Sequence, residues 1–202
     1  IDVDNAKIRA IYEDHNQNLW IGCYHRGMVM VSKESTPFHF WSVPIREYPQ
    51  AGVITALYKD DDGHIVSGVE GEGVFKITSE GNITDHLFSG KTVSSIYKDY
   101  SGNLWFGGYY SGLYMQDAKG NVRFMLPEIK LKDIKKITGD DKGNLYLSLF
   151  GSGFIRYHLP TQTVTEYQSS SGGLRNNWIY TLLLDSRERL WIGHCNGVDY
   201  FD

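Results

Sequence analysis

The sequence predicts an all-β fold, a β-propeller built of four-stranded antiparallel blades, and three observations favour it. One unit recurs five times along the 202 residues, and its anchoring aspartates lie 46, 39, 41 and 45 residues apart, at Asp14, Asp60, Asp99, Asp140 and Asp185. A period in the low forties is typical of propeller blades. The 22 glycines among many aromatic and β-branched residues indicate short strands joined by tight turns. The apolar residues show no helical periodicity, so we expect almost no helix.

The third copy shows what each part of the unit does. Val93–Asp99 is predicted to be the innermost strand, and Asp99–Gly102 a tight turn, with aspartate first and glycine fourth as type I turns prefer. Leu104–Gly107 is the second strand, in which Trp105 supplies buried area between blades while the glycine admits the next backbone. Gly112 opens the third strand.

A weaker outer strand completes each of the first four blades. These strands are predicted at Phe38–Trp41, Ile83–Leu87, Val122–Met125 and Val164–Tyr167. The chain is then one propeller domain, 1–202, whose blades span approximately 1–43, 44–90, 91–128, 129–170 and 171–202, the last incomplete. We expect both faces of every strand to be buried between neighbouring blades, except at the rim.

Some positions depart from the unit. The second copy has Val66 where others carry Trp or Tyr, and the fourth has Ser148 where others carry Gly. Gln17 and Glu188 occupy the turn-glycine position of the first and fifth copies. We expect those two turns to be longer or strained, because only glycine adopts left-handed backbone freely.

Composition excludes several classes of protein. The formal charge is −4, and the longest basic cluster, Lys130 to Lys136, is interpreted as a solvated linker face, so we expect no nucleic-acid partner. No apolar run is long enough to cross a bilayer. Two cysteines, Cys23 and Cys195, are too few for a disulfide scaffold.

The repeat closely resembles the two-component-regulator propeller repeat. The fifth copy is the nearest match, with Gly173-Leu174, Asn177, Ile179, Leu182, Asp185 and then Leu190-Trp191-Ile192-Gly193. The resemblance implies a seven-bladed propeller on the periplasmic side of a bacterial hybrid two-component histidine kinase, with further blades and the kinase in the same polypeptide. It also implies a homodimeric receptor, often one concerned with polysaccharide use, that meets the membrane only through parts absent here.

Five copies do not decide whether the propeller ring closes with five blades or needs further ones. The chain begins at Ile1 without an initiator Met and ends within the fifth blade, so we expect an excised fragment that lacks two blades. Alternatively, five blades close on themselves and Ile1–Val3 supplies the last outer strand.

The loops that join the second and third strands vary from copy to copy, as a binding surface requires. In a propeller they emerge on one face together with the loops that join successive blades. The candidate ligand-binding residues are Tyr24, His25, Arg26, Glu70, Glu72, Tyr109, Tyr110, Phe150, His194 and Asn196. The aromatic rings suit stacking on sugars and the polar groups suit hydrogen bonding; in the plainer interpretation they only fill the channel mouth.

We therefore expect an extracytoplasmic ligand-sensing segment that responds to a carbohydrate. Alternatives are a structural or protein-docking propeller and, less favoured, a propeller lyase or glycosidase. No catalytic residue, metal site or cofactor is predicted. The recurring aspartates are interpreted as turn residues, and Asp60–Asp62 as a solvated turn. Cys23, His25, His194 and Cys195 would assemble a zinc site only if the first and last blades were neighbours.

Overall fold

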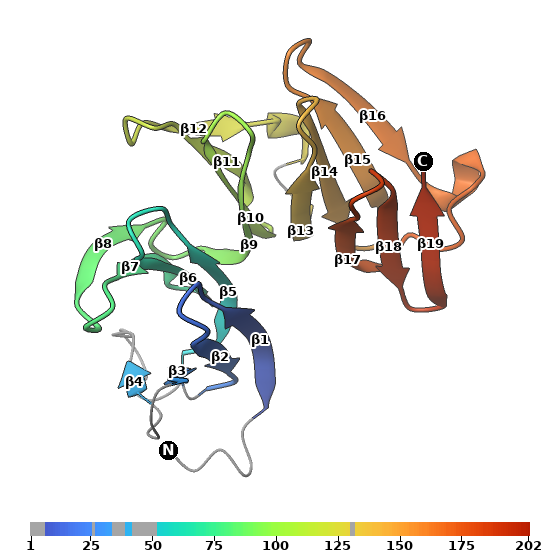
Figure 1. The fold of residues 1–202 in the computed structure, drawn as a ribbon. Coiled ribbons are helices and arrows are strands. Elements are labelled where there is room, and N and C mark those ends of the chain that lie inside the picture. The colour runs from blue at the N-terminus through green and yellow to red at the C-terminus, as the bar shows by residue number, and fades with distance from the viewer. Residues whose placement is uncertain (1–6, 26, 34–38, 42–51, 130–131) are drawn as a thin grey trace. The chain divides into compact units, whose positions relative to one another are not determined.

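The computed structural model describes residues 7–25, 27–33, 39–41, 52–129 and 132–202 (Figure 1). Within these residues the fold is all-β: five antiparallel sheets of a β-propeller and two single-turn 3-10 helices, Pro127–Ile129 and Ser169–Ser171. Each sheet is an up-and-down meander in which strands consecutive in sequence are hydrogen-bonded neighbours. The predicted fold class and the near absence of helix are confirmed.

Each sheet is one blade, and its strands run in chain order from the innermost outward. The first blade contains β1 (Ile8–Glu13), β2 (Leu19–Cys23), β3 (Gly27–Val31) and β4 (His39–Trp41), and the second contains β5 (Ile54–Lys59), β6 (Ile65–Val69), β7 (Gly73–Ile77) and β8 (Ile83–Leu87). The third contains β9 (Thr92–Lys98), β10 (Leu104–Tyr109), β11 (Gly112–Gln116) and β12 (Val122–Met125), and the fourth contains β13 (Ile134–Gly139), β14 (Asn144–Leu149), β15 (Gly153–His158) and β16 (Thr163–Tyr167). The fifth contains three strands, β17 (Ile179–Leu184), β18 (Leu190–His194) and β19 (Gly197–Phe201). Phe38, which was predicted to begin an outer strand, and Ile1–Val3, which would supply one only if five blades close the ring, lie outside the described residues.

The chain divides into two compact units, residues 1–93 and 94–202. In the first unit, Trp20 and Met28 of the first blade pack with Ile54 and Phe75 of the second. In the second unit, apolar clusters form between the third and fourth blades and between the fourth and fifth. Side chains between adjacent sheets therefore form the cores within each unit, as expected for propeller blades.

An aspartate fixes the turn between the first and second strands of the third blade. Asp99 Oδ1 accepts hydrogen bonds from the backbone N–H groups of Ser101 and Asn103, both at 2.9 Å. Its Oδ2 accepts from Asn103 Nδ2 at 3.0 Å and from the indole Nε1 of Trp105 at 2.8 Å. Asp99 and Trp105 are both buried. The carboxylate thus ties the turn to the side chain that fills the space between blades, and we call this arrangement the indole anchor.

The indole anchor recurs in the first and fifth blades. Trp20 Nε1 donates to Asp14 at 3.0 Å, and Trp191 Nε1 donates to Asp185 at 2.8 Å. Burial alone would raise the pKa of Asp14, but hydrogen bonds led by that from Trp20 hold it below its usual value. The hydrogen bond from Trp191 likewise lowers the pKa of Asp185. The carboxylates are therefore structural, as the sequence predicted.

The two blades without tryptophan keep the aspartate and change its partner. In the fourth blade the Tyr146 hydroxyl donates to Asp140 Oδ2 at 3.3 Å, and burial followed by this carboxylate raises the pKa of Tyr146 to about 12. In the second blade Val66 offers no donor, and Lys76 Nζ of the third strand lies 2.6 Å from Asp60 Oδ2. A lysine one strand further out thus takes the place of the indole.

The turns without glycine are strained and have the ordinary length. Gln17 and Glu188 both have φ of 62°, in the left-handed region where Gly102 has 86°. Their N–H groups donate to the aspartate carbonyls three residues earlier, as that of Gly102 does. Of the two outcomes expected from the sequence, strain rather than extra length is observed.

Gly107 of the third blade allows the fourth blade to approach closely. A Cβ at this position would lie 2.7 Å from Ile134 Cγ2, closer than such atoms approach in proteins. The fourth blade carries Ser148 here, and its fully buried hydroxyl accepts a hydrogen bond from Lys136 N at 2.8 Å. Serine can therefore replace glycine at this buried position, because its hydroxyl forms a hydrogen bond with the backbone.

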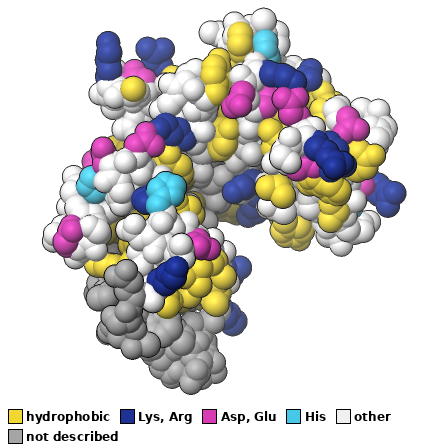
Figure 2. Space-filling view, viewed as in Figure 1, with side chains coloured by type: hydrophobic (Ala, Val, Ile, Leu, Met, Phe, Trp, Pro, Cys, Tyr) yellow, Lys and Arg dark blue, Asp and Glu magenta, His cyan; other side chains and the backbone are white. Residues whose placement is uncertain are grey.

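The expectation that both faces of every strand are buried between neighbouring blades, except at the rim, was wrong for two blades. Ile8 and Ile11 of β1 are 53% and 60% exposed, because no sheet of the first unit covers that face. Leu183, Val198 and Tyr200 of the fifth blade are likewise exposed. Hydrophobic side chains accordingly reach the surface over β1 and over the β17–β19 sheet (Figure 2).

Candidate functional site

The loops between second and third strands share one backbone form in the first four blades. Their second residue has a positive φ: 72° at Gly71 and 77° at Gly151, but also 55° at His25 and 45° at Tyr110. A non-glycine residue in this region costs about 1 kcal/mol. Two blades therefore keep a large ring where the turn favours glycine, and such strain is often associated with function.

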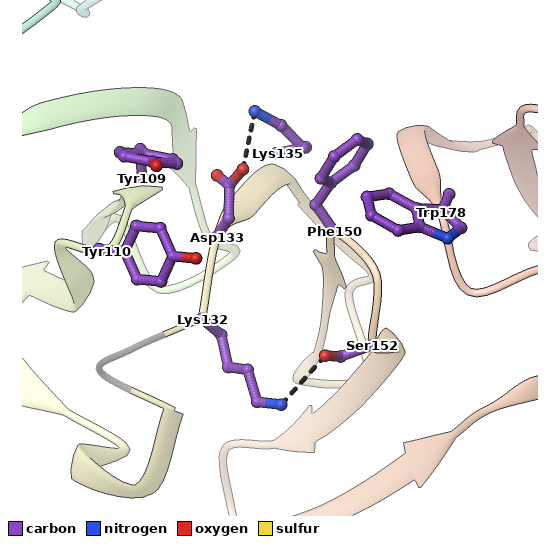
Figure 3. A pocket seen from close by; sticks show the side chains of 8 residues that line it. All are labelled: Tyr109, Tyr110, Lys132, Asp133, Lys135, Phe150, Ser152 and Trp178. Atoms are coloured by element: carbon purple, nitrogen blue, oxygen red, sulfur yellow. Dashed lines mark hydrogen bonds and ion pairs between the residues drawn. The ribbon is translucent and has the colours of Figure 1, made fainter.

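A cavity of about 510 Å³ opens beside these loops in the second unit (Figure 3). Tyr109, the last residue of β10, and Tyr110, in the connection between β10 and β11, reach it; Phe150 reaches it from the connection between β14 and β15. Trp178, the residue before β17, completes the aromatic lining. Three consecutive blades thus contribute rings to one cavity.

The four rings form two edge-to-face pairs. The Tyr109 and Tyr110 centroids are 4.4 Å apart at 83°, and those of Phe150 and Trp178 are 4.7 Å apart at 84°. Both tyrosines and Trp178 are more than half exposed. A bound molecule could therefore cover a large apolar area, which aromatic side chains supply in binding sites.

Asp133 and Lys135 form an ion pair in the wall of the cavity. Lys135 Nζ lies 2.8 Å from Asp133 Oδ2 and 5.0 Å from the centroid of Phe150. Asp133 is 8% exposed, and its Oδ1 has no hydrogen-bond partner among the described residues. Its carbonyl accepts from Phe150 N at 2.9 Å and so fixes the neighbouring loop.

Lys132 and Ser152 line another side of the cavity. Lys132 Nζ donates to Ser152 Oγ at 3.0 Å, as the dashed line in Figure 3 shows. Lys132 itself is exposed. The cavity therefore combines aromatic rings with two ammonium groups, one carboxylate, and the hydroxyl groups of one serine and two tyrosines.

Of the predicted candidates, the structure brings Tyr109, Tyr110 and Phe150 together in the lining of one cavity. Sequence reasoning did not select Trp178, and it interpreted the lysines from Lys130 to Lys136 as a solvated face; Lys130 itself lies outside the described residues. The signal was available, because loops between successive blades were expected on the same face. The residues just before each inner strand therefore belonged among the candidates.

The remaining candidates of the first unit lie in its two equivalent loops. The Tyr24 and His25 rings meet edge to face with centroids 3.9 Å apart, and the Arg9 guanidinium lies 4.9 Å from the Tyr24 centroid. Glu70 is exposed, and the Glu72 carbonyl bonds the ring of His86. Arg26 lies outside the described residues.

The two candidates of the fifth blade have different surroundings. The His194 side chain is fully buried, and its Nδ1 accepts from Asn196 N at 3.1 Å. The hydrogen of the neutral ring is therefore on Nε2, which lies 3.2 Å from Asp199 Oδ2. Asn196 is exposed. Of these two residues, only Asn196 is accessible to a ligand as the structure stands.

One group of potential metal ligands occurs among the described residues. Asp60, Asp62 and His64 have ligand atoms within 4.8 Å of one another. Lys76 Nζ lies 2.6 Å from Asp60 and 3.9 Å from Asp62, so an ammonium group of the protein already pairs with both carboxylates. Cys23 is buried and Cys195 is exposed.

Across the described part of the chain, no helix has the length and apolar character needed to span a membrane.

Comparison with known proteins identifies the repeat. The family model of the two component regulator propeller matches residues 2–25, 87–110 and 173–196. Histidine kinase P4 of Formosa agariphila is 28% identical over 73% of this chain, which spans 12% of that relative. The chain is thus far shorter than the curated relative it matches.

Solved structures with the same fold include an extracellular domain of a hybrid two component system and a lyase. The extracellular domain of a protein described as a hybrid two component system from B. thetaiotaomicron matches 98% of this chain with a TM-score of 0.82 and 20% identity, and the match spans 28% of that domain. A virginiamycin B lyase from Staphylococcus aureus matches 96% of this chain and 69% of its own, with a TM-score of 0.74 and 14% identity. At these identities the likeness establishes the fold alone.

The repeated unit, the sheets that it forms and the family match agree that this chain contains two-component-regulator propeller repeats, at residues 2–25, 87–110 and 173–196.

Proposed function

We propose that this chain is the ligand-sensing segment of a periplasmic receptor in a hybrid two-component system, and that its aromatic cavity binds an oligosaccharide. The observation that carries the proposal is the convergence of Tyr109, Tyr110, Phe150 and Trp178, from three blades, on one cavity of about 510 Å³. Sugars present apolar C–H faces that stack on aromatic rings and hydroxyl groups that need polar partners. The cavity offers both kinds of contact.

The backbone supports a role in binding. Tyr110 has φ of 45°, whereas the equivalent residues of the second and fourth blades are glycines. A tyrosine that costs about 1 kcal/mol of folding free energy and remains 58% exposed contributes little to the core. Its large ring is better explained by contact with a ligand.

The polar groups suit recognition better than acid–base chemistry. Of the described residues that line the cavity, Asp133 is the sole carboxylate, and it is paired with Lys135. None of the described histidines lines it. Hydrolysis of a glycosidic bond commonly requires two carboxyl groups that flank the bond. We therefore propose binding without turnover, although some proteins of this fold are lyases.

The proposal is tested by calorimetry and thermal shift of the purified chain with a panel of neutral and acidic oligosaccharides. Binding should raise the melting temperature. Trp178→Ala should lower the binding affinity about fivefold, because one aromatic contact of about 1 kcal/mol is lost. Tyr100→Ala is the matched control, because Tyr100 is 53% exposed in the turn at the other end of β10. No binding by any saccharide, or equal effects of the two variants, would contradict the proposal.

A further inference from the structure

We infer that the saccharide bound in this cavity is acidic, and that Lys132 binds its carboxylate or sulfate group. The inference rests on the proposed function, because it concerns the same cavity. It adds the chemical class of the ligand and the residue that selects it. Three features of the described residues support it.

The first feature is the distribution of charge. Lys135 and Asp133 are 2.8 Å apart and compensate each other. Lys132 forms no ion pair with any carboxylate among the described residues, and its partner there is the neutral Ser152 hydroxyl. The lining therefore carries one positive charge in excess, on a chain whose formal charge is −4.

The second feature is the set of donors that remain. An ammonium group has three N–H donors and no acceptor. Lys132 uses one of them toward Ser152, so two remain for a ligand. Carboxylate and sulfate oxygens accept charge-assisted hydrogen bonds, which are stronger than the neutral bonds that a sugar hydroxyl would form with the same donors.

The third feature is the placement of this ammonium group relative to the rings. Figure 3 shows Lys132 extended toward Ser152, with Tyr110 on one side and Phe150 and Trp178 on the other. A sugar that stacks on these rings would bring its substituents near the ammonium group. Lys135 is less suited to this role, because it lies over the Phe150 ring and already holds Asp133.

The carboxylate of Asp133 disfavours an anionic group of the ligand in its own part of the cavity. Asp133 lines the cavity and its Oδ1 is buried without a hydrogen-bond partner, so an anion nearer to Asp133 than to Lys132 would lie close to a carboxylate. The anionic group is therefore directed toward Lys132 and away from Asp133. The cavity accordingly favours one orientation of an acidic sugar.

The test is calorimetric titration of the purified chain with trigalacturonic acid and with its methyl ester, which keeps the sugar rings and removes the charge. A sulfated galacto-oligosaccharide and its desulfated form make a second pair, so that carboxylate and sulfate are distinguished. We expect at least one acidic ligand to bind about tenfold more tightly than its neutral form, with a preference that decreases as salt increases.

Lys132→Gln should abolish that preference by weakening the binding of the acidic ligand more than that of its neutral form, and the variant should still fold, since the exposed side chain contributes little to folding. Lys119→Gln is the matched control, because Lys119 is exposed in the turn between β11 and β12 and removes the same charge. Equal binding of acidic and neutral forms, or a preference that survives Lys132→Gln, overturns the inference and leaves the proposed function standing. No binding by any saccharide overturns both.

Discussion

Replacing Asp99 by asparagine tests the indole anchor. The new amide would keep one oxygen for the backbone N–H groups of Ser101 and Asn103, and its NH₂ group would face the side-chain amide of Asn103 and the indole of Trp105. Two donors would then lack an acceptor. Trp105 is 2% exposed, so water cannot replace the missing partner.

The expected loss can be worked from these contacts. A buried donor without a partner costs about 1–3 kcal/mol, and a hydrogen bond to a charged group contributes about 1.5–3 kcal/mol. Because the two terms overlap, we expect Asp99→Asn to lower the free energy of unfolding by about 3 kcal/mol. That is a large part of the ~5–15 kcal/mol of a typical domain.

The assay is urea denaturation followed by tryptophan fluorescence, with Asp117→Asn as control. Asp117 accepts hydrogen bonds from the backbone N–H groups of Lys119 and Asn121 with the same geometry, but it is less buried than Asp99 and accepts none from an indole, so the loss should be much smaller. Trp105→Phe should also make Asp99→Asn less costly, because it removes the stranded donor. Equal losses at Asp99 and Asp117, or strict additivity with Trp105→Phe, would refute the reasoning.

Three further outcomes are expected. Gly107→Ala should lower the free energy of unfolding by about 2 kcal/mol in urea denaturation, because its Cβ would lie 2.7 Å from Ile134 Cγ2; an unchanged midpoint would contradict the close packing of these blades. Gln17→Gly should raise the free energy of unfolding by about 0.5 kcal/mol, because the relief of left-handed backbone strain outweighs the larger conformational entropy that glycine gives the unfolded chain. A lower melting temperature of this variant would contradict that explanation. The carboxyl groups of Asp14, Asp60 and Asp185 have pKa values below their ordinary value of 3.8. Their ionised forms stabilise the fold fully above that pH and progressively less as the pH falls below it. Acid titration followed by circular dichroism should therefore show unfolding below about pH 4 and little change between pH 5 and 7. Stability that increased on acidification would be inconsistent with these shifts.

The repeat allowed most strands to be predicted, because each blade repeats the same turn and spacing. The outer strands Ile83–Leu87 and Val122–Met125 were predicted with the bounds observed. The partner of Asp60 was not predicted, since Lys76 lies on the next strand and its approach depends on the register between β6 and β7. Period and spacing specify a strand better than they specify contacts across strands.

The cavity could be predicted only in part for a similar reason. The variable loops marked Tyr109, Tyr110 and Phe150, but Trp178 belongs to the segment before an inner strand and reaches the cavity because it packs beside Phe150. His194 was selected as a loop residue, yet its ring is buried against Asp199 of the following strand. Such placements depend on tertiary packing, which one loop considered alone does not reveal.

The hydrogen bonds of the indole anchor all close within one blade, between Asp99 and Trp105 in the third and between Asp185 and Trp191 in the fifth. A duplicated gene segment that encodes one blade therefore carries every group needed to form its own turn. Recombination can then alter the number of copies without rewriting those that remain. Copy number and ligand preference can evolve separately in such a molecule, the first by gain or loss of whole segments and the second by single codons in the loops.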